Sequence, residues 1–167
     1  MSKNRDIKRK EELATRTKNE SFRFQVEFKR KQKGIDIMGW EERLNAELDA
    51  ICENGLTEDL LSLGEIIEGV QKELGINQET DKCSLNGAIV PYILGITVIC
   101  PDSTAYNPHL FNRGNQKLQV TICYSNEVRN QVVEWIKPQY DGVTTRIGQP
   151  ILKLQNMVVE FKRVLKG

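Results

Sequence analysis

The spacing of apolar residues along the chain predicts five helices. In each segment apolar side chains recur three and four positions apart, which places them on one buried face. The expected helices cover residues 38–54, 57–74, about 84–94, 126–137 and about 150–166. The Thr57 hydroxyl is in position to cap the second helix, and Pro150 suits the first position of the last. Pro91 lies inside the third helix and is expected to kink it or to end it early.

Strict alternation of apolar and polar residues predicts strands. It runs over residues 21–28, SFRFQVEF, where four apolar side chains share one face. It recurs over residues 117–124, KLQVTICY, and residues 142–147, GVTTRI, are expected to form a third strand. A few strands among several helices predict an α+β or an α/β fold.

The charge is distributed unevenly along the chain. The 167 residues are 39% apolar and 28% charged, which fits one globular domain, and the net charge is only +1. Residues 1–33 nevertheless hold 12 Lys and Arg against 5 Asp and Glu, whereas residues 34–167 carry a net charge of −6. We therefore expect a basic N-terminal extension over residues 1–37, containing one strand, and an acidic body over residues 38–167.

Several classes of protein and site are not expected. No apolar stretch is long enough for a membrane span, and the charged N-terminus does not resemble a signal peptide. The four cysteines form no CxxC pair, so we expect reduced thiols in a cytoplasmic protein. His109 is the single histidine, which argues against a structural zinc site and against a catalytic triad.

Three segments have residue patterns that resemble those of a known family. Residues 41–56 read EERLNAELDAICENGL, residues 82–97 read KCSLNGAIVPYILGIT, and residues 106–113 read YNPHLFNR. In that order they resemble ERLxxELxxIxxxGF, GRGSAAGSLVAYLLGIT and YNLLFERFLNP in the palm domain of the bacterial DNA polymerase III alpha subunit, a C-family DNA polymerase. The resemblance covers roughly three quarters of the chain. It implies an α+β fold like the polymerase β nucleotidyltransferase palm, in which helices pack on a small mixed sheet.

The chain departs from the family at the catalytic strand. The family carries P-D-x-D-x-D there, whose carboxylates hold the two magnesium ions of phosphoryl transfer. This chain has Gln119, Thr121 and Cys123 at the matching positions, all on one face of the expected strand. These side chains lack the carboxylates that Mg²⁺ prefers, so the resemblance implies no catalytic residue, no metal and no cofactor. The family's third catalytic carboxylate is expected beyond the end of this chain.

The loop that matches the family's phosphate-contacting loop is also altered. Lys82, Ser84 and Gly87 remain as a remnant, but Asp81 and Cys83 stand where the family has glycines. Lys82 then either meets a phosphate or is a solvated loop residue. Ser84 and Gly87 either retain part of a phosphate site or serve as a helix cap and a close packing contact.

The basic extension is the strongest nucleic-acid signal in the sequence. Clustered cations bind phosphate, and aromatic side chains can stack on bases. The candidate residues beside the phenylalanine-rich segment are Arg23, Lys29, Arg30, Lys31 and Lys33. The alternative is a solvated basic segment whose phenylalanines pack on the body.

Three functions follow from these observations. The first is a catalytically inactive palm-like protein that binds DNA or a replication-related partner. The second is a divergent Mg²⁺-dependent nucleotidyltransferase or DNA polymerase fragment that uses other acids, such as Asp102, Glu127 or Asp141. The third is a module that engages only proteins.

Overall fold

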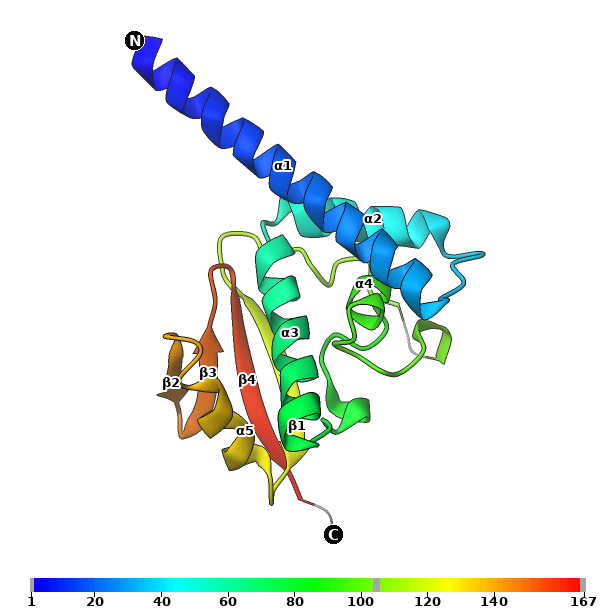
Figure 1. Ribbon diagram of the computed structural model, residues 1–167, viewed down its shortest axis with the longest axis vertical. Helices are drawn as coiled ribbons and strands as arrows, with labels where there is room; N and C mark the ends of the chain where they lie inside the picture. The colour runs from blue at the N-terminus through cyan, green and yellow to red at the C-terminus, as the bar shows by residue number, and fades with distance from the viewer. Residues whose placement is uncertain (1, 104–105, 166–167) are drawn as a thin grey trace.

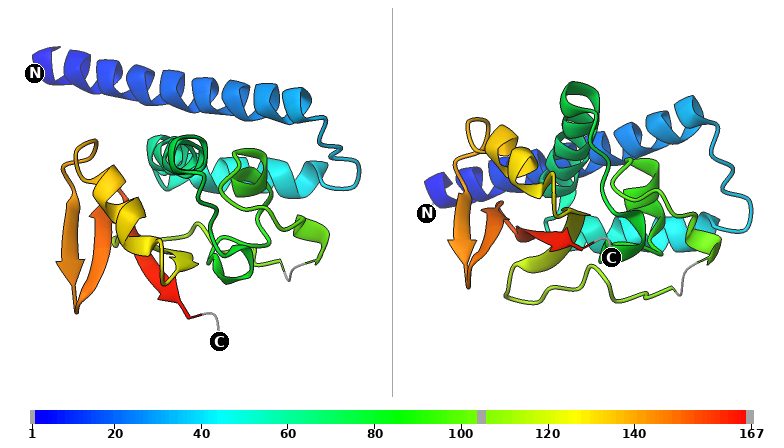
Figure 2. Two further views of the ribbon diagram at one scale, coloured as in Figure 1. Left: turned by 60° about the horizontal axis from the view of Figure 1, so that its bottom comes forward. Right: turned by 90° about the horizontal axis from the view of Figure 1, so that it is seen from below.

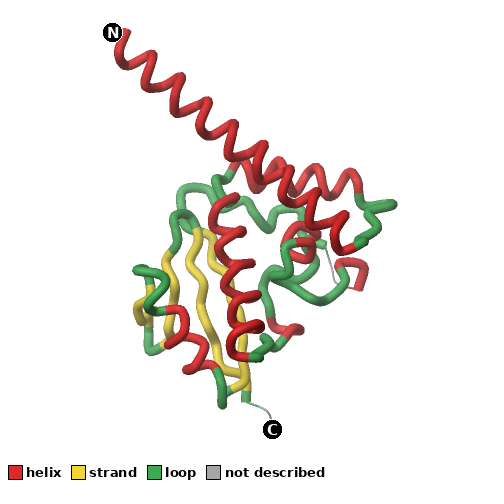
Figure 3. Tube along the Cα trace, in the orientation of Figure 1, coloured by secondary structure: helices red, strands yellow, loops and turns green. Residues whose placement is uncertain are grey.

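The computed structural model describes residues 2–103 and 106–165 and has an α+β fold. Figure 1 labels the helices and strands, and Figure 3 separates them by type. In chain order the elements are α1 (Ser2–Lys33), α2 (Glu41–Glu53), α3 (Thr57–Leu74), η1 (Thr80–Lys82), α4 (Ile89–Ile93), η2 (Pro101–Ser103), β1 (Leu118–Ser125), α5 (Arg129–Ile136), β2 (Val143–Arg146), β3 (Gln149–Lys153) and β4 (Met157–Val164).

The strands form one small mixed sheet in the order β1-β4-β3-β2. β1 pairs with β4 in parallel, and the β2–β3 and β3–β4 pairs are antiparallel. Helices α3 and α5 lie over one face of this sheet (Figures 1 and 2). Apolar residues from both layers, such as Leu63, Val120 and Val159, form the core between them.

The predicted strand over residues 21–28 is wrong, because these residues belong to the long helix α1. Phe22 and Val26 are four positions apart, so a helix places both on one face, where they join the core. Phe24 and Phe28 point away and are exposed. The N-terminal half of α1 extends beyond the rest of the molecule (Figure 1).

The predicted C-terminal helix over residues 150–166 is also wrong, because the segment forms most of β3 and all of β4. Ile147 and Gly148 both have positive φ, 50° and 76°, and they connect β2 to β3 in a tight hairpin. The β-branched residues of the segment favour a strand over a helix. Asp59 on α3 accepts hydrogen bonds from the backbone N–H groups of residues 155 and 156 and so fixes the turn before β4.

The remaining elements agree with the spacing of the apolar residues, with changes at helix ends. The structure confirms the helices over residues 38–54, 57–74 and 126–137. It also confirms the strands over residues 117–124 and 142–147. The third helix is shorter than expected and spans only α4. Thr57 is the first residue of α3, and its side chain makes no capping hydrogen bond.

A buried glutamate on α2 caps α4. Both oxygens of Glu47 accept the N–H of Ile89, at 2.9 and 2.8 Å, and Oε1 also accepts the N–H of Val90 at 3.0 Å. The side chain of α4's own N-cap residue, Ala88, makes no capping hydrogen bond. Glu47 therefore satisfies helix N–H groups that have no partner within α4.

Among the described residues, no helix combines the length and the apolar character that crossing a membrane requires.

Candidate nucleic-acid interface on the open sheet face

One face of the sheet points away from α3 and α5, and we call it the open face. Strand pairing assigns its members, because paired residues point to the same side. It comprises Gln119, Thr121, Cys123, Ser125, Thr144, Arg146, Gln149, Ile151, Lys153, Val158, Glu160, Lys162 and Val164. Within residues 2–103 and 106–165, no helix lies over this face (Figure 2).

Gln119, Thr121 and Cys123, which the sequence resemblance aligns with catalytic aspartates, lie on this face of β1. Gln119 is exposed, Thr121 is partly exposed and Cys123 is buried. In the parallel pairing of β1 with β4, Thr121 lies opposite Glu160, and Cys123 lies opposite Lys162. Each of the two positions therefore has a charged neighbour, one anionic and one cationic.

An arginine crosses the middle of the open face. Arg146 on β2 donates from Nη1 to Oε1 of Gln119 on β1 at 2.9 Å, and its Nη2 lies 3.8 Å from Oε2 of Glu160. Since β3 and β4 lie between β1 and β2, this side chain passes over both central strands. The single carboxylate of the open face is thus paired with a cation.

The loop that contains Lys82 and Ser84 lies along the outer edge of β1. Ser84 is paired twice with Thr121, because its N–H donates to the Thr121 carbonyl at 3.2 Å and its Oγ accepts the Thr121 N–H at 2.9 Å. The N–H of Glu79 donates to the Cys123 carbonyl at 2.7 Å. Residues 79–84 therefore occupy hydrogen-bonding groups that an edge strand would otherwise leave open.

Gly87 has a structural environment. It is buried with φ at 97°, a backbone conformation that favours glycine. Its carbonyl accepts a hydrogen bond from Nη2 of Arg43 on α2 at 2.9 Å. Of the two interpretations, a phosphate site or a structural role, these contacts favour the structural role for Gly87. Ser84 is also engaged within the chain, but it bonds to β1 and caps no helix.

Two lysines and two acids lie around the Cys123 end of the open face. Burial raises the pKa of Cys123, the charges of Lys162 and Lys82 lower it, and those of Asp81 and Glu160 raise it. Burial also raises the pKa of the neighbouring Cys83 thiol, to about 11. Both thiols are therefore uncharged at neutral pH, and the local charge comes from these lysines and acids.

The basic residues predicted on the extension are mostly engaged within the chain. Arg23 donates to Asp49 at 2.6 Å, Arg30 pairs with Glu27, and Lys33 donates to the Ile93 carbonyl at 2.7 Å. Lys31 is exposed and lies 3.8 Å from Glu27. Lys29 is partly exposed and lines a cavity. Four of the five cations therefore have partners within the chain.

The alternative acids do not come together. Asp102 accepts a hydrogen bond from the Trp40 indole at 2.7 Å, and Glu127 and Asp141 lie on separate exposed loops. Across residues 2–103 and 106–165, no group of three or more His, Cys, Asp and Glu side chains is arranged to hold a metal ion.

The sequence did not indicate the cross-strand neighbours of the three β1 positions. Glu160 and Lys162 fall within the predicted helix over residues 150–166. Their positions beside Thr121 and Cys123 in the sheet therefore do not follow from the sequence pattern. The signal in the sequence that could have revealed them is the alternation of apolar and polar residues over residues 159–162, VEFK.

No protein-family model matches this sequence, and no curated protein matches it either.

Proposed function

We propose that this chain is a catalytically inactive, palm-like protein that binds nucleic acid on the open face of its sheet. The observation that carries the proposal is the pair of lysines, Lys82 and Lys162, beside Cys123. Ammonium groups in this place attract a phosphate backbone without activating it. The motifs that resemble the DNA polymerase III alpha palm supply the second line of support.

The architecture fits this proposal. A palm of the polymerase β type has helices on one side of a small mixed sheet and leaves the other side for its substrate. The four-stranded mixed sheet here has α3 and α5 on one face. Although the body after residue 33 has a net charge of −6, the open face and the adjoining η1 carry four cations against two acids. They are Lys82, Arg146, Lys153 and Lys162, against Asp81 and Glu160.

The chemistry of the face argues against catalysis. Two-metal phosphoryl transfer needs several carboxylates that coordinate both ions. Glu160 is the one carboxylate among the strand residues of the open face, and it lies beside Arg146. Thr121 and the protonated Cys123 thiol are poor ligands for Mg²⁺.

Binding to a labelled primed DNA is expected to weaken steeply with salt. Fluorescence anisotropy of the full chain, measured at about 50 mM and about 150 mM salt, gives the slope of log affinity against log salt concentration. The double variant Lys82→Glu/Lys162→Glu should bind at least about tenfold more weakly and lower this slope by about two, one for each lost phosphate contact.

The matched control reverses two charges on the helical layer. Lys72→Glu/Lys137→Glu has the same net charge as the test variant, and both lysines are exposed, on α3 and directly after α5. Its affinity should stay within about twofold of the original chain. Equal losses in both double variants would contradict binding at the open face. The absence of binding at low salt would favour a module that engages only proteins.

We also expect no extension of a primed template when the chain is supplied with nucleotides and Mg²⁺ or Mn²⁺. The reason is the missing set of carboxylates on the open face. The measurement is a gel-based extension assay on the full chain and on the Glu160→Gln variant. Extension that is present in the original chain and lost in Glu160→Gln would identify an active nucleotidyltransferase and overturn this part of the proposal.

A further inference from the structure

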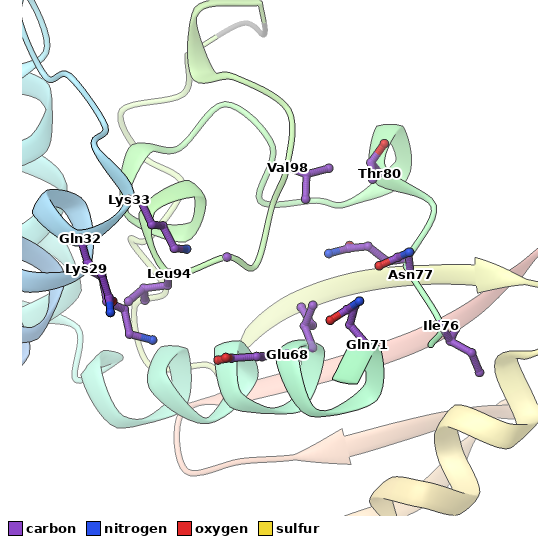
Figure 4. Close-up of a pocket in the computed structure, with 13 residues that line it drawn as sticks. Lys29, Gln32, Lys33, Glu68, Gln71, Ile76, Asn77, Thr80, Leu94 and Val98 are labelled. Carbon is purple, nitrogen blue, oxygen red and sulfur yellow. The ribbon is translucent and has the colours of Figure 1, made fainter. Parts of the chain in front are cut away.

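A cavity of about 700 Å³ lies between the end of α1, the second half of α3 and the loop around residues 94–98 (Figure 4). Its apolar walls come from Ile67, Ile76, Leu94 and Val98. The volume is within the range of sites that take small organic ligands, about 300–1,000 Å³. The cavity shares no residue with the open face.

One polar group at this cavity lacks a partner. Gln78 lines the cavity, and its side chain is only 7% exposed. Its Nε2 donates to the Ile96 carbonyl, but its Oε1 has no hydrogen-bond partner among the residues that the structure describes. A buried acceptor without a donor is unfavourable. This oxygen is fully buried, so a donor in the cavity would reach it only after the Gln78 amide turns toward the cavity.

Two lysines enter the same cavity from α1. Lys29 and Lys33 both line it (Figure 4), and Lys33 Nζ also donates to the Ile93 carbonyl at 2.7 Å. Burial and the charge of Lys29 lower the pKa of Lys33, and the charge of Glu68 opposes this. Glu68 is the one acid in the lining; it pairs with Lys72 at 2.7 Å, and the charges of Lys29 and Lys33 also lower its pKa. The lysine end of the cavity therefore favours an anion.

We propose that this cavity is a binding site for a small organic anion that has an apolar body and an N–H or O–H donor. The anionic group would lie at Lys29 and Lys33, the apolar body would contact the aliphatic walls, and the donor would bond to Gln78 Oε1 once that amide turns toward the cavity. This site is independent of the nucleic-acid surface, since the two share neither residues nor ligand.

The test uses 1-anilinonaphthalene-8-sulfonate, which combines an aromatic body, an N–H donor and a sulfonate. Its fluorescence on titration into the full chain should rise and saturate below about 1 mM, the range of a weak specific site. N-phenyl-1-naphthylamine, which lacks the sulfonate, should bind at least about tenfold more weakly, because a charge-assisted hydrogen bond is lost.

Two variants locate the binding site. Lys29→Gln should raise the dissociation constant of the sulfonate about tenfold. Val98→Trp, which places a large side chain at an exposed position of the lining, should abolish saturable binding. Lys31→Gln is the matched control, because it removes the same charge from an exposed position on the same helix outside the cavity. Circular dichroism melting of each variant verifies that it is folded.

Three outcomes would overturn the proposal. One is the absence of saturable binding in the folded original chain. Another is an equal effect of Lys29→Gln and Lys31→Gln, which would assign the attraction to general charge. The last is unchanged binding to folded Val98→Trp, which would place the probe elsewhere, for example on the exposed Phe24 and Phe28 of α1.

Discussion

Replacement of Glu47 by alanine is expected to lower the free energy of unfolding by about 3 kcal/mol. The carboxylate is 5% exposed and accepts the N–H groups of Ile89 and Val90 at the start of α4. Both of these residues are fully buried, so water cannot replace the lost acceptor. Urea unfolding at neutral pH, followed by circular dichroism, measures the change.

Two further variants separate the cap from the charge. Glu53→Ala removes an exposed acid from the same helix and should change the free energy of unfolding by less than about 0.5 kcal/mol. Glu47→Gln keeps an oxygen acceptor and should cost less than Glu47→Ala. If all three variants were equally stable, the contact between α2 and α4 would not depend on this side chain.

The same residue gives a pH dependence with a definite sign. Burial raises the pKa of Glu47 above its ordinary value of 4.5, and the N–H donors of Val90 and Ile89 only partly oppose this. A raised pKa means that the folded state favours the protonated carboxyl. The stabilisation from this preference is present below the unfolded pKa and is lost as the pH rises through the folded pKa. The stability lost in Glu47→Gln relative to the original chain should therefore become smaller as the pH rises above the ordinary glutamate value of 4.5, and urea unfolding of both proteins over a pH series measures this.

The spacing of apolar residues was sufficient to predict the secondary structure of segments that bury one face. The apolar stripes of α2, α3 and α5 repeat at helical spacing over several turns, and the structure has each of these helices. β1 alternates over its whole length, so the common face of Gln119, Thr121 and Cys123 followed from a period of two. In these segments only one of the two periods, helix or strand, fits the apolar residues.

Short patterns failed where two periods fit the same residues. Phe22 and Val26 are two steps apart in an alternating pattern and also one helical turn apart. The polar residues before them continue α1, and this context decides in favour of the helix. Residues 157–164 are apolar on both sides at their start, because Val158 and Val159 are both buried. Such a segment has no single period, and its apolar residues also fit a helix.

The two candidate sites depend on contacts between distant segments. Lys162 reaches Cys123 through the pairing of β4 with β1, and Lys82 reaches it through the loop along the edge of β1. The cavity joins Lys29 to Gln78 across nearly fifty positions of sequence. Neither contact can be predicted from the spacing of residues within one segment. The pairing of distant strands and helices depends on how the whole core packs.

Replacement of Phe22 by alanine is expected to lower the free energy of unfolding by about 3 kcal/mol, whereas Phe24→Ala should change it by less than about 0.5 kcal/mol. Phe22 is 1% exposed and lies in the core, while Phe24 is 71% exposed on the outer side of α1. The two variants delete the same atoms two positions apart. The difference between their free energies of unfolding, measured in urea, therefore reports the effect of burying the side chain.

This pair also decides between the two structures that the sequence allows for residues 21–28. In a strand, Phe22 and Phe24 share one face and their replacements would cost similar amounts. In α1 they lie on different sides, and Val26, four positions after Phe22, is the residue that should behave like it. Val26→Ala should therefore be clearly destabilising and Phe28→Ala nearly neutral, since Phe28 is exposed. Equal losses at positions 22 and 24 would contradict the docking of α1 on the body through Phe22 and Val26.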